Sequence, residues 1–438
     1  MLNRTVAPKI NPTHCKRLVL PQPTILSNGI ELWTVSGGKD DLCRISFFTA
    51  GGELQESKPL VAILSALMMY KGNRHKNSFD ISEAFDFCGA FHSTNTYNHF
   101  TENAFSCLNK NFCEIASLFV DCFIEPTFPR AELASLKTRL AESFKVSVQN
   151  TSYLAAVEMR KRCYGSQHPL GRPVSITKIR SITRTDLVNF HSLYHMAGGA
   201  KLVLSGNVDD KIADCVLRTF GSLPHHAPQK LSESLPYCPS PKMFSVVNCK
   251  GAVQSSIRIR LHTIDNRDPD YYALRILVNA LGGYFGSRLN MAIREDNGLT
   301  YGVGAALVGG PGNSRIEIST DCDVAYTFQV IEAIKGEIVK LKESPISEEE
   351  LHSVCQYVLS RQIKMLDSPF KLANYIGKTI VGNIASEHYN SLSCAIADIS
   401  AKELQRVANR CFDLDKLRIV VACDKAKLKA VKNHGFSF

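Results

Sequence analysis

Hydrophobic and polar positions follow two different periods along the chain. Apolar residues recur at every second position at 43–48 and again at 257–261, which is typical of a half-buried strand, more often antiparallel than parallel. At 331–341 the apolar residues recur instead at intervals of three and four, which predicts a helix. Strands followed by a block of helices predict an α+β fold, with helices packed on one face of an antiparallel-rich sheet.

The second half of the chain repeats the first. Residues 150–156 recur 217 positions later at 367–373, and residues 181–187 recur at the same offset at 398–404. A period this long indicates a duplicated domain rather than the short repeat of a solenoid. We therefore predict two homologous α+β domains that arose by tandem duplication.

A proline-rich stretch separates the two copies. Five prolines lie between residues 224 and 241 in a mostly polar context, which is typical of a linker. We therefore expect a first domain at 1–222, a linker at 223–245 and a second domain at 246–438.

Composition and charge narrow the class of protein. The 438 residues contain no run that approaches the ~20 apolar residues of a membrane-spanning helix. The 15 cysteines include no CxxC pair, and prolines interrupt the N-terminal residues where a secretory signal needs an apolar run. We therefore expect a cytoplasmic protein with no membrane association. The net charge of +10 is dispersed and is not interleaved with aromatic residues, so we expect no nucleic-acid partner.

Several common catalytic devices are absent from the sequence, which has no GxSxG, Walker, HExxH or GxGxxG motif. His191 and His195 lie four residues apart on an expected helix, a spacing that can place two imidazoles on one metal. No acidic residue lies between them and a core strand follows, so a structural role is favoured over a metal site.

The segment 280–303 has a more specific pattern. A glycine-marked turn enters a helix that ends at Arg294, Asn297-Gly298 interrupts the chain, and Tyr301 opens a strand. This segment resembles the signature of the pitrilysin-type metallopeptidases, or inverzincins, which include mitochondrial processing peptidase. In that family an Arg and a Tyr at this spacing, in the second of two duplicated α+β domains, reach the scissile peptide. The resemblance implies that Arg294 and Tyr301 contact the substrate and stabilise the transition state.

The same resemblance implies a zinc site in the first domain, on a helix that carries the motif H-x-x-E-H. In that motif the two histidines bind zinc and the glutamate acts as general base. Here Ile63 and Leu67 occupy the histidine positions and Ala66 occupies the glutamate position, and none of them can bind a metal or move a proton. Glu142 lies near the place of the family's third ligand, but one carboxylate does not hold zinc without the imidazoles.

The resemblance therefore implies a divided active site. We expect a zinc-free, cofactor-free subunit that lends Arg294 and Tyr301 to a homologous, zinc-bearing partner subunit, or pairs with a second copy of itself. The substrates are expected to be peptides that add a strand to an exposed sheet edge. The alternative is a non-enzymatic homodimer that binds peptides or has a structural role. The retained Arg–Tyr pair favours the subunit, and the replaced motif disfavours a peptidase that is active alone.

Overall fold

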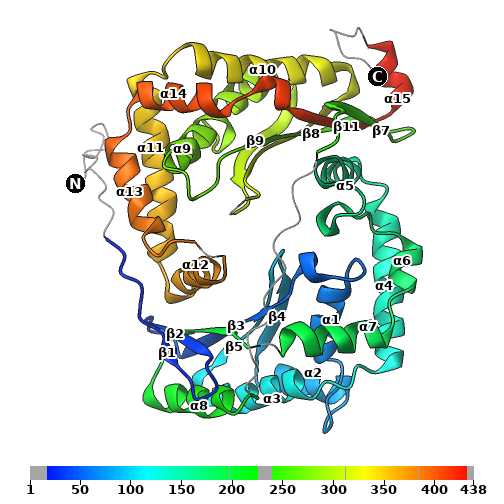
Figure 1. Ribbon diagram of the computed structural model, residues 1–438, viewed down its shortest axis with the longest axis vertical. Helices are drawn as coiled ribbons and strands as arrows, with labels where there is room; N and C mark the ends of the chain where they lie inside the picture. The colour runs from blue at the N-terminus through cyan, green and yellow to red at the C-terminus, as the bar shows by residue number, and fades with distance from the viewer. Residues whose placement is uncertain (1–16, 197, 225–238, 311, 383, 432–438) are drawn as a thin grey trace, which may run out of the picture.

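The computed structural model describes residues 17–196, 198–224, 239–310, 312–382 and 384–431. It consists of two halves that face each other, each built from one sheet and a layer of helices (Figure 1). The linker expected at 223–245 lies mostly outside the described residues. Within the described ranges, no helix is long and apolar enough to cross a membrane.

A six-stranded sheet forms the first half. Its strands are β1 (Thr24–Ile25), β2 (Glu31–Ser36), β3 (Leu42–Ala50), β4 (Phe91–Thr96), β5 (Phe100–Leu108) and β6 (Lys201–Gly206). They lie in the order β1-β2-β6-β3-β5-β4, with β2 and β6 parallel and all other neighbours antiparallel. The alternation at 43–48 falls in β3, where Cys43 and Ile45 are fully buried in the core.

The second half contains a five-stranded sheet. Its strands are β7 (Phe244–Asn248), β8 (Gln254–His262), β9 (Thr300–Val308), β10 (Arg315–Asp323) and β11 (Arg418–Cys423). The order β7-β11-β8-β10-β9 has one parallel pair, β7 with β11, and antiparallel neighbours elsewhere. This order and these orientations match β2-β6-β3-β5-β4 of the first sheet, so β4 and β9 are equivalent edge strands.

Helices make up the rest of both halves. Those of the first half are α1 (Val61–Met69), α2 (Ser78–Phe87), α3 (Phe112–Ile124), α4 (Arg130–Ser147), α5 (Thr151–Tyr164), α6 (Ile176–Arg180), α7 (Arg184–Phe190) and α8 (Asp210–Gly221). Those of the second are α9 (Tyr271–Gly282), α10 (Thr327–Glu343), α11 (Glu348–Ile363), α12 (Pro369–Val381), α13 (His388–Asp398), α14 (Ala401–Cys411) and α15 (Lys425–Ala430). The helix predicted from the apolar spacing at 331–341 is part of α10.

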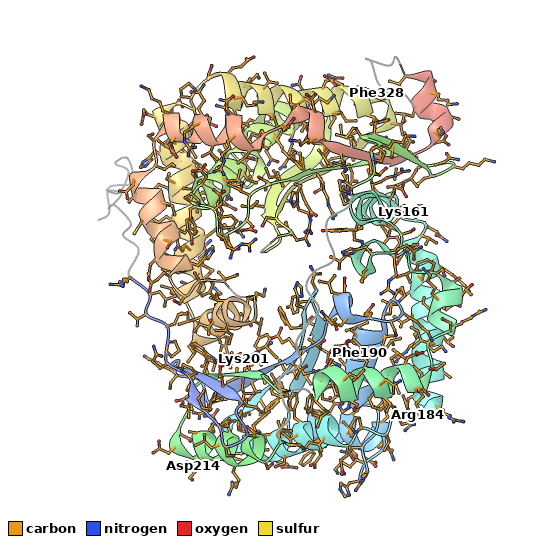
Figure 2. The ribbon with its side chains drawn as sticks, in the orientation of Figure 1. Lys161, Arg184, Phe190, Lys201, Asp214 and Phe328 are labelled. Carbon is orange, nitrogen blue, oxygen red and sulfur yellow. The ribbon has the colours of Figure 1, made fainter. Side chains whose placement is uncertain are left out.

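Each half has its own hydrophobic core between its sheet and its helices. Phe47 and Phe119 are almost completely buried in the first core, and Ile334 is completely buried in the second. The labelled Phe190 and Phe328 belong to one core each (Figure 2). Burying one such side chain contributes about 1.5–3 kcal/mol, so each half has a substantial core of its own.

The two halves exchange one helix each. Helix α12 packs on β2, β3 and β6 of the first sheet, and α5 packs on β8 and β11 of the second (Figure 1). Ile376 of α12 is fully buried in this contact. Gly377 allows the close approach, because a Cβ there would lie 2.5 Å from Cζ of Phe48. The exchanged helices begin within the repeated segments 150–156 and 367–373, so equivalent elements tie the halves together.

The α+β fold class predicted from the sequence is confirmed, with two antiparallel-rich sheets and many helices. One feature differs from the expectation of helices on one face, because the opposite face of each sheet receives the exchanged helix. Hydrophobic alternation shows that one face of a strand is buried, but it does not show that a helix from the other half covers the opposite face. The domain boundaries at 1–222 and 246–438 stay a prediction.

Candidate functional site

The segment around Arg294 begins where α9 ends beside the edge strand β9. Gly282 is required there, because a Cβ would lie 2.7 Å from both the nitrogen and the Cβ of Ala305. The chain then turns into a π-helical segment, η5 (Asn290–Glu295), which is followed by β9. In the loop between them Gly298 has a φ of +61°, a left-handed conformation that suits glycine. The turn, helix end and strand start lie where the sequence pattern places them.

A buried asparagine holds this segment in shape. The Nδ2 of Asn290 donates to the carbonyl oxygens of Tyr284 and Val303, both at 3.0 Å, and lies 3.1 Å from Oγ of Ser287. One side chain therefore joins the glycine turn, η5 and β9. Because a buried amide is expensive to leave unpaired, these contacts fix the position from which Arg294 projects.

Arg294 and Tyr301 both project outward from this scaffold. The Arg294 guanidinium carbon lies 4.8 Å from the ring centre of Phe285, and its Nε lies 3.4 Å from a carboxylate oxygen of Glu295. Tyr301 is 92% exposed, and no hydrogen bond to its hydroxyl occurs in the described part of the chain. Both side chains can therefore contact a second molecule without first breaking a buried interaction.

The helix that corresponds to the family's zinc motif is α1, which is apolar and largely buried. Ala66 of α1 is fully buried, and Ile63 and Leu67 are half-buried. At the next turn the buried Tyr70 stacks on His92 of β4 with ring centres 4.5 Å apart. Burial lowers the pKa of His92, with a smaller effect from a nearby lysine, so this imidazole is neutral at pH 7.

The carboxylates near α1 do not complete a metal site. Glu142 of α4 is exposed and lies 2.7 Å from Nζ of Lys145. Glu56 accepts hydrogen bonds from the backbone nitrogens of Leu60 and Ala62 at the start of α1. Burial raises the pKa of Glu56 to about 8. The described residues hold no group of three or more His, Cys, Asp or Glu side chains placed for one ion. The residues at the positions of the zinc motif do not fit the zinc ion that the family implies.

His191 and His195 are brought together by the structure, but as packed side chains. Nε2 of His191 lies 2.8 Å from the carbonyl oxygen of Phe123, and Nδ1 of His195 lies 3.1 Å from Oγ1 of Thr49. Burial lowers the pKa of both imidazoles, so both are neutral. These contacts agree with the structural role favoured from the sequence.

A cleft lies between the two halves, where α5 faces the second sheet. It has a volume of about 460 Å³ and is lined by Met159 of α5 and by three consecutive residues from each of β8, β9 and β10. Arg258 and Arg260 point into it from β8, and a guanidinium nitrogen of Arg260 lies 2.7 Å from Glu317. The cleft also reaches the edge strand β9 and Arg361 of α11.

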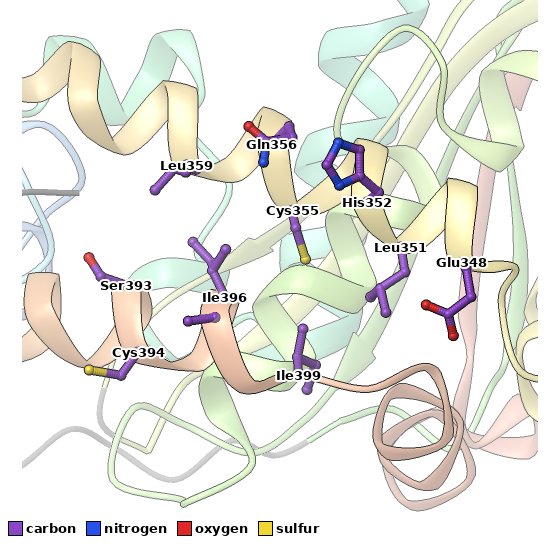
Figure 3. A pocket seen from close by; sticks show the side chains of 11 residues that line it. Glu348, Leu351, His352, Cys355, Gln356, Leu359, Ser393, Cys394, Ile396 and Ile399 are labelled. Carbon is purple, nitrogen blue, oxygen red and sulfur yellow. The ribbon is translucent and has the colours of Figure 1, made fainter. Parts of the chain in front are cut away.

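A second hollow, between α11 and α13, lies apart from these residues (Figure 3). Its titratable side chains Glu348, His352 and Cys355 point in different directions in Figure 3 and do not converge. Burial raises the pKa of the Cys355 thiol to about 11, so it is protonated at neutral pH and a poor nucleophile. This hollow offers no catalytic arrangement.

Known proteins resemble this chain over most of its length. Residues 181–357 match the Peptidase M16 inactive domain. An uncharacterised zinc protease of Bacillus subtilis, YmxG, is 23% identical over 399 residues, which cover 89% of this chain and 91% of the relative. An uncharacterised zinc protease of Mycobacterium tuberculosis, Rv2782c, is 23% identical over 315 residues, which cover 68% and 70%.

These matches support the pitrilysin-type, or M16, family. Solved structures also share the fold of this chain. A peptidase M16 inactive domain from Pseudomonas fluorescens has a TM-score of 0.82 at 22% identity, with 92% of this chain and 97% of that chain covered. A protease from Helicobacter pylori has a TM-score of 0.81 at 18% identity, with 92% and 98% covered. The pitrilysin-type fold predicted from the Arg–Tyr segment and the duplication is confirmed.

Sequence reasoning missed the cationic lining of the cleft. Arg258 and Arg260 alternate with buried isoleucines in β8, so they were visible in the sequence only as the polar face of a strand. Because the covering helix α5 comes from the other half, no local pattern shows that this polar face lines a cleft. The sequence feature that could have indicated this lining is the presence of arginine at both 258 and 260, two positions on the same face of β8.

Proposed function

We propose that this chain is a zinc-free subunit of a pitrilysin-type peptidase that supplies Arg294 and Tyr301 to a zinc-bearing partner subunit. A guanidinium and a phenol are hydrogen-bond donors for a peptide carbonyl as its oxygen becomes negative in the transition state. The partner supplies the metal and the attacking water, and this chain supplies binding and charge stabilisation. No proton is moved by α1, because its residues cannot ionise there.

One observation carries the proposal. Arg294 and Tyr301 are accessible on a scaffold fixed by Asn290, while the seat of the zinc motif in the same chain is apolar. Tyr301 is almost fully exposed. In the described part of the chain, Arg294 makes only surface contacts, with the Phe285 ring and with Glu295. The exposure of both side chains supports a role in contacting another molecule, and the lack of ligands supports a metal supplied by that molecule.

The sheet edges support peptides as the substrates. Strands β4 and β9 are the last strands of their sheets, and each pairs with only one neighbour. An extended peptide can add to such an edge through backbone hydrogen bonds, with little dependence on its sequence. Strand β9 begins at Thr300, so a peptide along its edge would start beside Tyr301.

The proposal includes a reducing, cytoplasmic environment. The 13 cysteines in the described part of the chain are all free thiols, and most are buried. Free buried thiols are typical of proteins that do not rely on disulfides.

Reconstitution tests the proposal. The purified chain is mixed with a homologous chain from the same genome that carries H-x-x-E-H, and hydrolysis of a quenched fluorescent peptide library is followed. We expect no stoichiometric zinc and no hydrolysis from this chain alone, and chelator-sensitive hydrolysis from the mixture. Stoichiometric zinc in the isolated chain, with chelator-sensitive activity, would contradict the proposal.

The alternative is a non-enzymatic homodimer that binds peptides or serves as a structural subunit. The free edges of β4 and β9 are compatible with it, because strand addition needs no metal. A chain that forms a dimer, binds peptides and activates no motif-bearing homologue would favour this alternative.

A further inference from the structure

A cationic pocket lies within the second half, between α9, α11, α12 and α13. It has a volume of about 460 Å³, within the usual range for small-molecule sites. Five cationic residues line it, namely Arg275, Arg361, Lys364, Lys371 and Lys378, and no described Asp or Glu does. Such a concentration of one charge favours an anionic ligand.

Arg275 is held in place without being neutralised. Its NH1 lies 2.9 Å from Nε2 of His388, whose Nδ1 lies 3.2 Å from the hydroxyl of Tyr272. Burial, helped by the positive charge of Arg275, lowers the pKa of His388 to about 4. The imidazole is therefore neutral at pH 7, accepts from Arg275 and leaves the full guanidinium charge available.

The other cations are also available. Within the described ranges, Arg361, Lys364 and Lys378 have no ion pair with a carboxylate, and the guanidinium carbon of Arg361 lies 5.8 Å from the ring centre of Tyr357. Lys371 lies 3.2 Å from Asp367, but both side chains are more than half exposed, so this pair is weak. A ligand would not have to displace a strong internal partner.

One buried polar atom on the lining residues lacks a partner in the part of the chain that the structure describes. Oε1 of Gln362 is buried without a hydrogen bond, whereas the buried hydroxyl of Tyr375 lies near Thr379 and the backbone of Tyr389. Gln362 is only 2% exposed, and its amide nitrogen is already used by the Tyr389 carbonyl and by Ser393. Because an unpaired buried group is destabilising, the amide oxygen of Gln362 points to a ligand. The hydroxyl can donate to an anion, and the amide oxygen needs a donor such as an N–H.

The rest of the pocket is apolar. Met365, Ile384 and Leu392 contribute to its lining beside the ring of Tyr375. A ligand that satisfies the whole pocket therefore combines an anionic group, a neighbouring N–H and an apolar body. An apolar amino acid with a free carboxylate and an amide nitrogen has all three, as does the C-terminal residue of a peptide.

We propose that this pocket binds the carboxylate of an apolar, N-acylated amino acid, either as the C-terminal residue of a peptide or as a free small molecule. The cations and the Tyr375 hydroxyl hold the carboxylate, Gln362 accepts from the amide N–H, and the apolar lining surrounds the side chain. Neither Arg294 nor Tyr301 lines the pocket, so the inference does not depend on the proposed subunit role. Arg361 also lines the cleft between the halves, which gives a peptide in that cleft a route to the pocket.

Calorimetry on the full chain alone tests the pocket. The probes are N-acetyl-phenylalanine, its C-terminal amide, a short alanine peptide ending in phenylalanine as acid and as amide, and inorganic phosphate. We expect each acid to bind roughly tenfold or more tightly than its amide, and salt to weaken only the acids. A peptide acid that binds better than N-acetyl-phenylalanine assigns a peptide ligand, and the reverse order assigns a small molecule.

Variants locate the binding. Arg361→Gln removes an exposed cation and Tyr375→Phe removes only a hydroxyl, so each is expected to lower acid binding several-fold while the protein stays folded. Lys402→Gln, which removes an exposed cation from α14 outside the pocket, is expected to bind as the wild type does.

Three results would overturn the proposal. Acids and amides could bind equally, phosphate could bind as well as the phenylalanine acids, or Arg361→Gln and Tyr375→Phe could bind as tightly as Lys402→Gln. Because the measurement needs no partner and no hydrolysis, its failure would leave the proposed subunit role untouched. Failure of the reconstitution would likewise leave the pocket intact.

Discussion

At the scale of single residues, the candidate site contains side chains that are free to contact a second molecule and a side chain that holds the surrounding backbone in place. Tyr301 is exposed and Arg294 is partly exposed, whereas Asn290 is buried and holds the turn, η5 and β9 together. The spacing of the first two could be predicted because they belong to a sequence pattern. The role of Asn290 could not be predicted. Its side chain donates to the backbone oxygens of Tyr284 and Val303 and to the Ser287 hydroxyl, and no sequence pattern marks these groups as its partners.

Replacement of Asn290 by alanine is expected to lower the free energy of unfolding by about 1–3 kcal/mol, since two buried carbonyl oxygens lose their donor. The measurement is urea unfolding followed by circular dichroism. Asn297→Ala is the control, because that side chain is exposed and donates only to the Ala292 carbonyl. Equal effects of the two substitutions would show that Asn290 does not hold the segment.

His388 is expected to make stability fall as the pH is lowered. Its pKa in the folded protein is about 4, below the ~6.5 of an unfolded histidine, so the unfolded state binds the extra proton between these values. The contribution of this group to the free energy of unfolding is therefore complete above pH ~6.5 and decreases toward pH ~4, by about 1.4 kcal/mol per pH unit at most. The measurement is urea unfolding between these pH values.

Histidine variants isolate this contribution. His388→Gln is expected to show a shallower decrease than the wild type, while His352→Gln, at an exposed position on α11, is expected to follow the wild-type curve. The contributions of other buried histidines cancel in the comparison. A His388→Gln curve parallel to that of the wild type would contradict the neutral state inferred for this imidazole.

At the scale of elements, the exchanged helices decide how the halves are joined. The sequence repeat relates the segments at which α5 and α12 begin, and hydrophobic periodicity predicted β3, β8 and α10. The exchange itself could not be predicted, because a helix pattern shows only that one face is buried and not against which sheet. Gly377 marks the contact in retrospect, since its missing side chain admits the ring of Phe48.

A pair of glycine substitutions tests this contact. Gly377→Ala places a Cβ 2.5 Å from the Phe48 ring and is expected to destabilise the protein by about 1–3 kcal/mol, despite the better helix propensity of alanine. Gly336→Ala in α10 meets nothing within 4 Å and is expected to stabilise it by up to ~1 kcal/mol. Thermal unfolding of both variants gives the comparison. Stabilisation by both substitutions would contradict the close approach of α12 to the first sheet.

At the scale of the whole molecule, the two α+β halves enclose a cleft, and arginines line the wall that the second half supplies. The net charge of +10 was evident from composition, but its position was not. The fold places Arg258, Arg260 and Arg361 on one cleft, although they come from a strand and a helix about 100 residues apart. Which distant residues meet depends on tertiary packing, and neither the composition nor the hydrophobic periodicity of the sequence shows it.

The division of labour between this chain and a zinc-bearing partner is tested most directly by the kcat/KM of the mixed complex. Arg294→Ala and Tyr301→Phe are each expected to lower it at least tenfold, since one lost donor to a developing oxyanion typically costs ~3 kcal/mol of barrier. Arg139→Ala, which removes an exposed arginine from α4, serves as the control with unchanged kcat/KM. Complexes of Arg294→Ala and Tyr301→Phe that form normally and hydrolyse peptide as fast as the control would contradict the proposed role of this chain.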